Sequence, residues 1–171
     1  YSLYLENNEI HPMGSGYTEN KRGAIVSFYQ VGVVREELKM DEARALIVES
    51  VKELVSRINE DKKLRRRLAY RKISPNKVHF SLIVTDTKGT HVADGKHVAR
   101  ISLRDGLVKY YKYDPDALIA QQKYEPTKLK SRFYSDRSAG KKRTDNLVLL
   151  DQELFTKAVS IHEKPEISLW D

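Results

Sequence analysis

The chain has 171 residues, of which 40% are hydrophobic and 32% are charged, and its formal net charge is +7. This length and apolar content suffice for a packed core, and no apolar run reaches the roughly 18 residues that a membrane-spanning helix needs. The absence of cysteine excludes disulfides, thiolate metal sites and cysteine nucleophiles. We therefore expect a single domain over residues 1–171 without a membrane span.

The basic residues gather in two segments. Residues 61–72, DKKLRRRLAYRK, contain seven Lys or Arg and one acid, and residues 109–143 contain ten Lys or Arg and four acids. Segments of this kind attract polyanions or acidic partners. The plainer alternative is a solvated helix face in the first segment and a basic surface loop, over residues 123–145, in the second.

The N-terminal third predicts an arm, a strand and a long helix. Residues 1–21 mix Pro, Gly, Asn and Ser without periodicity, which indicates an irregular arm. Residues 23–34 are rich in β-branched and aromatic residues, which indicates a strand, although its place in the sheet is not readable. Apolar residues then recur every three or four positions over residues 41–59. This spacing predicts an amphipathic helix with Asp41 as N-cap, continuing or restarting through residues 60–70.

More strands and a C-terminal helix follow. Residues 77–84 alternate between apolar and polar, and two further alternating runs, 98–103 and 107–113, flank the dipeptide Asp105–Gly106. Asp-Gly between such runs is typical of a two-residue hairpin turn. Residues 147–163 predict a final helix, or a strand followed by a helix. The β-α-β-β-β order indicates an α+β fold, with a mostly antiparallel sheet of about four strands and the long helix packed on one face.

The hairpin turn decides which side chains share a face of the sheet. It places Ile101 opposite Tyr110 and Arg100 opposite Tyr111, so that the aliphatic residues and Tyr110 point into the core. The other face collects cationic and tyrosine side chains, and these form the candidate ligand-binding surface: Arg100, Arg104, Lys109, Tyr111 and Tyr113. Such a surface can stack bases and contact phosphates, but the same pairs also stabilise ordinary sheets.

Two further groups could contact ions. The segment SAGKKRTD adds Lys141, Lys142 and Arg143 to the candidate ligand-binding residues, as a cluster of point charges without the spacing of a phosphate loop. His91, Asp94 and His97 have the spacing H-x-x-D-x-x-H, which offers donors for zinc. A hairpin turned at residues 94–95 would send the two imidazoles to opposite faces. We therefore predict no metal site.

No pattern in the sequence indicates catalysis. The chain lacks the G-x-S-x-G nucleophile elbow and the glycine-rich phosphate loop. The sequence therefore predicts neither catalytic residues nor a cofactor.

Residues 40–84 resemble a segment of small, uncharacterised exported bacterial proteins. In that family a helix ending in INxxxxLRxxL leads through a tyrosine-containing segment and a Ser/Thr-Pro turn into a strand. The matching residues are Ile58, Asn59, Leu64, Arg65, Leu68, Tyr70, Ser74, Asn76 and the strand from Val78. The resemblance implies a periplasmic or envelope location after removal of a signal peptide or lipoprotein leader. It implies no activity, and no secretory signal is visible in the chain itself.

The sequence as a whole predicts a non-enzymatic exported protein. We expect it to bind a protein partner or an anionic ligand through the basic sheet face and the basic loop. The alternative is a single-stranded nucleic-acid-binding module in the cytoplasm. A hydrolase or metal-dependent enzyme is the least favoured reading.

Overall fold

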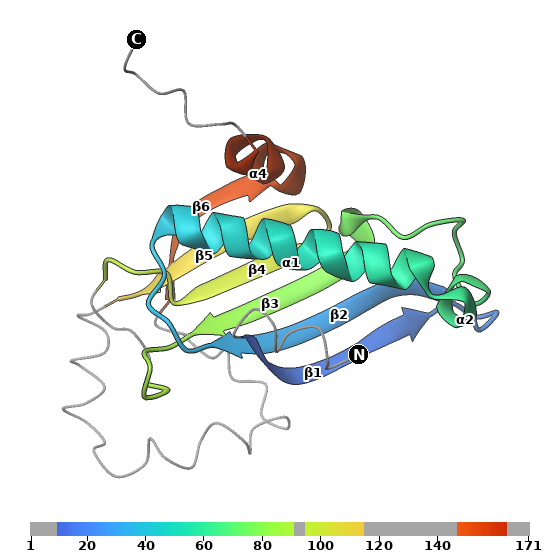
Figure 1. The fold of residues 1–171 in the computed structure, drawn as a ribbon, viewed down its shortest axis with the longest axis horizontal. Helices are drawn as coiled ribbons and strands as arrows, with labels where there is room; N and C mark the ends of the chain where they lie inside the picture. The colour runs from blue at the N-terminus through green and yellow to red at the C-terminus, as the bar shows by residue number, and fades with distance from the viewer. Residues whose placement is uncertain (1–9, 91–94, 115–146, 164–171) are drawn as a thin grey trace.

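Six strands form one sheet in the computed structural model, which describes residues 10–90, 95–114 and 147–163 (Figure 1). The strands lie side by side in chain order: β1 (Ile10–Glu19), β2 (Ile25–Val34), β3 (Val78–Val84), β4 (Arg100–Arg104), β5 (Leu107–Tyr113) and β6 (Leu147–Leu154). The β2–β3 pair is parallel and the other neighbours are antiparallel. The predicted α+β class is confirmed, and the expected count of about four strands was too low.

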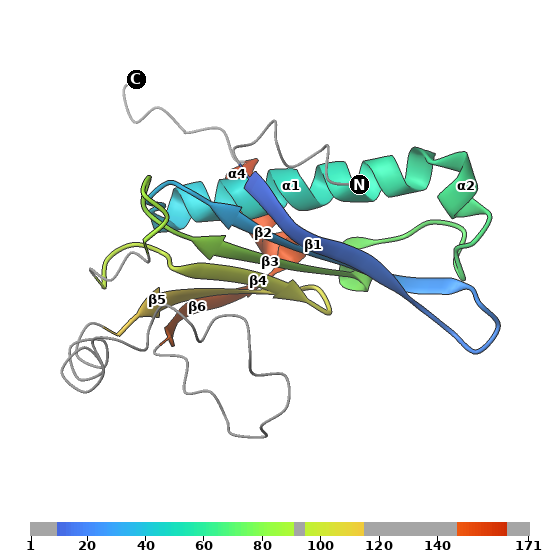
Figure 2. The ribbon, with the colours of Figure 1, turned by 90° about the horizontal axis from the view of Figure 1, so that it is seen from below.

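The helices lie on one side of this sheet (Figure 2). Helix α1 (Met40–Glu60) connects the parallel strands β2 and β3, and α4 (Phe155–His162) follows β6 and packs beside α1. Two side-chain contacts join this pair of helices: His162 Nε2 lies 3.3 Å from Glu49 Oε1, and Lys52 forms an ion pair with Glu163. Helix α2 (Lys62–Arg65) and the short 3-10 helix η2 (Pro75–Lys77) belong to the connection from α1 to β3.

The core lies between the sheet and α1. Alternate residues of β3 and β4 are buried while their neighbours are partly exposed, because successive side chains of a strand point to opposite faces. Helix α1 contributes buried residues at three- and four-residue spacing: Ala43, Ile47, Val48, Ser50, Val51, Leu54 and Ile58. The inward positions of the sheet and this helix stripe form one continuous hydrophobic cluster.

The start of α1 differs from the prediction, whereas its C-terminal end follows one of the two predicted forms. Lys39, not Asp41, is the N-cap of α1, and Asp41 lies in the first turn. The helix does not continue past Glu60 but restarts, because the Asp61 carboxylate accepts hydrogen bonds from the backbone N–H groups of Lys63 and Leu64 at 2.8 and 3.0 Å. An N-cap of this kind starts a new helix at the point where the long one ends.

Asn59 holds the chain that returns from α2 toward β3. Its amide Nδ2 donates to the Ile73 carbonyl at 3.0 Å, and its Oδ1 accepts from the Ile73 N–H at 2.8 Å. Both backbone groups of Ile73 are thereby satisfied on one side chain. The Ile-Asn pair of the resemblance therefore has a structural role here, since Ile58 is buried and Asn59 fastens the return segment.

The arm expected over residues 1–21 contains a strand, β1, within its described part. Pro12, Gly14 and Gly16 interrupt any alternating pattern, yet β1 pairs along its length with β2 and has a register shift after Pro12. As an edge strand, β1 tolerates proline on its unpaired side. The segment from residue 147 is a strand followed by a helix, one of the two forms predicted for it.

Candidate ligand-binding surface

The β4–β5 hairpin has the predicted turn and register. Asp105 and Gly106 both have positive φ, 52° and 78°, as a type I′ turn requires. Arg100 pairs with Tyr111, and Ile101 pairs with Tyr110. Ile101 and Tyr110 are fully buried, whereas Arg100 and Tyr111 retain some exposure. The predicted division of the hairpin into a core face and an outer face is therefore confirmed.

The outer side chains belong to the face of the sheet opposite α1 and α4, which we call the open face. Among the described residues no helix covers it (Figure 2). Strand pairing aligns its side chains in rows that cross the sheet. One row runs through Val31, Ser81, Ser102, Lys109 and Gln152. The neighbouring row runs through Val33, Ile83, Arg100, Tyr111 and Leu149.

On the open face, the cationic side chains of Lys109 and Arg104 lie next to the short side chains of two serines. Ser81 and Ser102 are directly opposite each other on β3 and β4, and Ser102 is opposite Lys109 on β5. At the hairpin end, the Arg104 side chain is 77% exposed and its Nε lies 3.6 Å from the Asp105 carboxylate. A pair this exposed contributes little to stability, so Arg104 can exchange Asp105 for an external anion at small cost.

Tyr29 and His79 extend the surface beyond the predicted residues. They are partners on the parallel strands β2 and β3, and Tyr29 is also opposite Gly16 of β1. The hydroxyl end of the Tyr29 ring occupies the space where a Cβ on Gly16 would lie, and Tyr29 remains 47% exposed. His79 Nε2 lies 3.6 Å from Asp105 Oδ1, which connects this group to the hairpin turn.

Tyr113 also belongs to the open face, whereas other predicted residues lie outside the described part of the chain. Tyr113 ends β5, opposite Leu147 of β6, and its alternation with Tyr111 places it on the open face. Lys141, Lys142 and Arg143 lie outside the described residues, as do His91 and Asp94. Of the proposed metal donors His97 alone is described, and the described part of the chain holds no cluster of three His or acidic residues suited to a metal ion.

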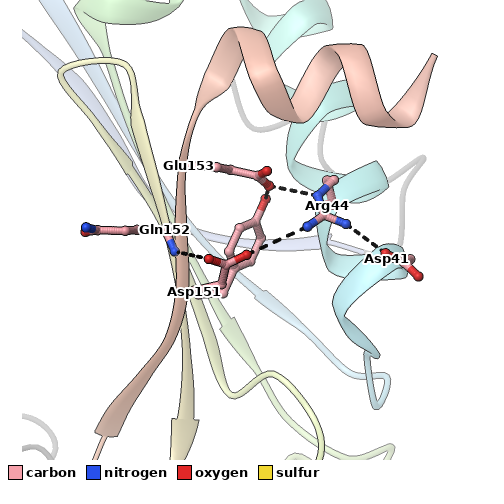
Figure 3. A network of polar contacts seen from close by, with 6 residues as sticks. Asp41, Arg44, Asp151, Gln152 and Glu153 are labelled. Atoms are coloured by element: carbon pink, nitrogen blue, oxygen red, sulfur yellow. Dashed lines mark hydrogen bonds and ion pairs between the residues drawn. The ribbon is translucent and has the colours of Figure 1, made fainter. Parts of the chain in front are cut away.

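A buried polar network lies on the other side of the sheet, where β6 meets α1 (Figure 3). Glu153 Oε1 accepts hydrogen bonds from the Tyr110 hydroxyl at 2.9 Å and from Arg44 Nε at 2.8 Å. Arg44 also donates to Asp41 at 2.7 Å, and it approaches Asp151 at 3.9 Å. The Glu153 side chain is only 1% exposed. Since each buried group has a partner and solvent cannot reach the carboxylate, the network serves to hold β6 against α1.

The ionisation of this network follows from its burial. Desolvation raises the pKa of Tyr110 far above its usual range, and the hydrogen bond to Glu153 raises it further. For Arg44, desolvation acts to lower the pKa, but the hydrogen bond and the charge of Glu153 outweigh it and the net pKa is raised. Tyr110 therefore stays protonated and Arg44 stays charged at neutral pH. This agrees with the structural role predicted for Tyr110.

We compared the chain with known protein families, curated proteins and solved structures and found no match. Within the described ranges, none of the helices combines the length and apolar character needed to cross a membrane.

Proposed function

We propose that this protein is a non-enzymatic binding protein that holds an anionic partner on its open face. The observation that supports this most directly is the placement of Arg104 and Lys109 on a sheet surface that no described helix covers. Among the described ion pairs of these two cations, one acid takes part, Asp105. Its carboxylate lies 3.6 Å from Arg104 and also 3.6 Å from His79. An acidic partner would complement this surface and approach it faster for that reason.

A second candidate is the binding of single-stranded nucleic acid. Its specific support is the position of Tyr111 beside Arg100, together with the exposed ring of Tyr29 on the same face. A base stacked on such a ring contributes about 1–3 kcal/mol, while the cations contact phosphates. The two candidates differ in what the tyrosines do: an acidic protein partner needs the cations, whereas single-stranded nucleic acid needs the cations and the rings.

Fluorescence anisotropy separates these candidates. The probes are a labelled polyglutamate peptide and a labelled 12-nucleotide single strand, each titrated at about 50 and 200 mM salt. We expect binding that weakens with salt, because phosphate or carboxylate contacts release counterions. The variant Arg104→Gln/Lys109→Gln should bind both probes at least about tenfold more weakly, since two contacts of about 0.7 kcal/mol each correspond to tenfold. Failure of both probes to bind at 50 mM salt would overturn the proposal.

A matched control removes the same charge elsewhere. Lys21 and Arg22 are exposed in the β1–β2 turn, and Lys21→Gln/Arg22→Gln should change binding less than twofold. If this control loses as much affinity as the open-face variant, net charge rather than the open face governs binding. Tyr111→Ala then discriminates the partners: loss of single-strand binding with unchanged polyglutamate binding favours the nucleic-acid candidate.

We also propose an exported location, in the periplasm or cell envelope. The support is the resemblance of residues 40–84 to small exported bacterial proteins, and the matching residues include the buried Ile58 and Asn59, which hydrogen-bonds to Ile73. Fractionation of the source cells, with an antibody against this chain, tests it. Recovery in the cytoplasmic fraction would contradict export and would favour the nucleic-acid candidate.

A further inference from the structure

A second basic surface lies at the far end of the helical layer. A hollow of about 420 Å³ opens beside α2, and its lining consists of Lys62, Arg65, Arg66, Tyr70 and Arg71. We call it the α2 pocket. Helix α2 follows the C-terminal end of α1, on the helical side of the sheet (Figure 2). The α2 pocket is therefore separate from the open face.

The cations of this pocket lack the acidic neighbours that Arg57 and Arg67, close to them in the chain, have. Arg57 pairs with Glu53 at 2.6 Å, and Arg67 next to the pocket pairs with Glu19 on β1. By contrast, no described carboxylate lies within ion-pair distance of the four lining cations. Asp61, the acid nearest in sequence, directs its carboxylate to the backbone of α2.

Helical spacing forces these charges together. Lys62 is three residues before Arg65 and four before Arg66, so the three side chains project from neighbouring positions. Like charges at such spacing repel each other and destabilise a helix. The return segment adds Arg71 to the lining, and Asn59 keeps that segment in place through its two hydrogen bonds to Ile73. A bound anion with several charges would relieve the repulsion of all four cations at once.

We propose that the α2 pocket binds a ligand that carries a chain of phosphates. Guanidinium groups bind phosphate oxygens in a bidentate manner, and three of the four lining cations are arginines. The volume lies within the range of small-molecule sites. Tyr70 forms part of the wall, is 43% exposed and has the Lys77 ammonium 5.6 Å from its ring centroid. Free polyphosphate and a nucleoside triphosphate share this chemistry.

Isothermal titration calorimetry with inorganic tripolyphosphate tests the site. The variant Arg65→Gln/Arg66→Gln/Arg71→Gln should bind tripolyphosphate at least about tenfold more weakly than the wild type. Its matched control, Arg22→Gln/Arg35→Gln/Lys88→Gln, removes three exposed charges from other parts of the surface and should stay within twofold. Urea unfolding of both variants verifies that each remains folded. Equal affinity in the pocket variant and the control, or no binding by the wild type at 50 mM salt, would overturn the proposal.

Two further arms identify the source of the phosphates and the independence of the site. ATP should bind as tightly as tripolyphosphate if the phosphate chain alone is recognised. Tighter binding of ATP, reduced to the tripolyphosphate level by Tyr70→Ala, assigns a nucleotide that stacks on the ring. The open-face variant Arg104→Gln/Lys109→Gln should leave tripolyphosphate binding unchanged. Loss of binding in that variant would place the anion on the open face and refute the α2 pocket.

Discussion

Replacing Glu153 by alanine should lower the free energy of unfolding by about 3 kcal/mol. The carboxylate is 1% exposed and accepts two hydrogen bonds, one from the neutral Tyr110 hydroxyl and one from the charged Arg44. The first is worth about 1 kcal/mol and the second about 1.5–3 kcal/mol. Loss of one member of a buried ion pair costs roughly 3–5 kcal/mol. The lower end applies here because Arg44 keeps Asp41 as a partner.

Urea unfolding followed by far-UV circular dichroism at neutral pH measures this effect. Asp41→Asn is the control, since its side chain is 93% exposed and its ion pair should contribute less than about 1 kcal/mol. Glu153→Gln should fall between the two, because the amide oxygen still accepts from Tyr110 but the charge is gone. If Glu153→Ala is no more destabilised than Asp41→Asn, the network does not hold β6 against α1 and the reasoning fails.

Three further predictions test separate parts of the fold. Tyr110→Phe should reduce the loss of stability that the wild type shows above about pH 10. Burial raises the pKa of Tyr110 in the folded state, so the unfolded wild-type chain deprotonates first and its unfolding becomes easier by up to about 1.4 kcal/mol per pH unit. Urea midpoints that fall equally steeply with pH in both proteins would contradict this. Gly106→Ala should lower the free energy of unfolding by about 2 kcal/mol and Gly89→Ala by about 1 kcal/mol. Both glycines have positive φ, but only a Cβ at Gly106 overlaps the Asn76 side chain. In an Asn76→Ala background, thermal unfolding should show equal losses for the two variants. Asn59→Ala should cost about 2 kcal/mol, because two hydrogen bonds to the backbone of Ile73 are lost. Equal urea midpoints for this variant and the wild type would show that Asn59 does not hold the return segment.

The candidate surface was predictable where a turn dipeptide set the register. Asp105–Gly106 fixed the pairing of β4 with β5, and with it the side of the sheet on which Arg104 and Lys109 lie. Tyr29 could not be assigned in the same way. Its exposure depends on the pairing of β2 with β1, and β1 carries proline and glycines that resemble a loop. That Gly16 leaves room for the Tyr29 ring can be recognised only when the pairing of β1 with β2 is known.

The sequence by itself determined the local elements with strong periodicity: the helix α1, the alternating strands β3, β4 and β5, and the tight turn between the last two. These elements depend on interactions between residues a few positions apart, and the sequence gives that spacing directly. The tertiary structure alone decided the parallel contact of β2 with β3, the addition of the edge strands, and the meeting of Arg44 with Glu153 across 109 residues. Such contacts depend on which surfaces must be buried together, and that is a property of the whole packed chain.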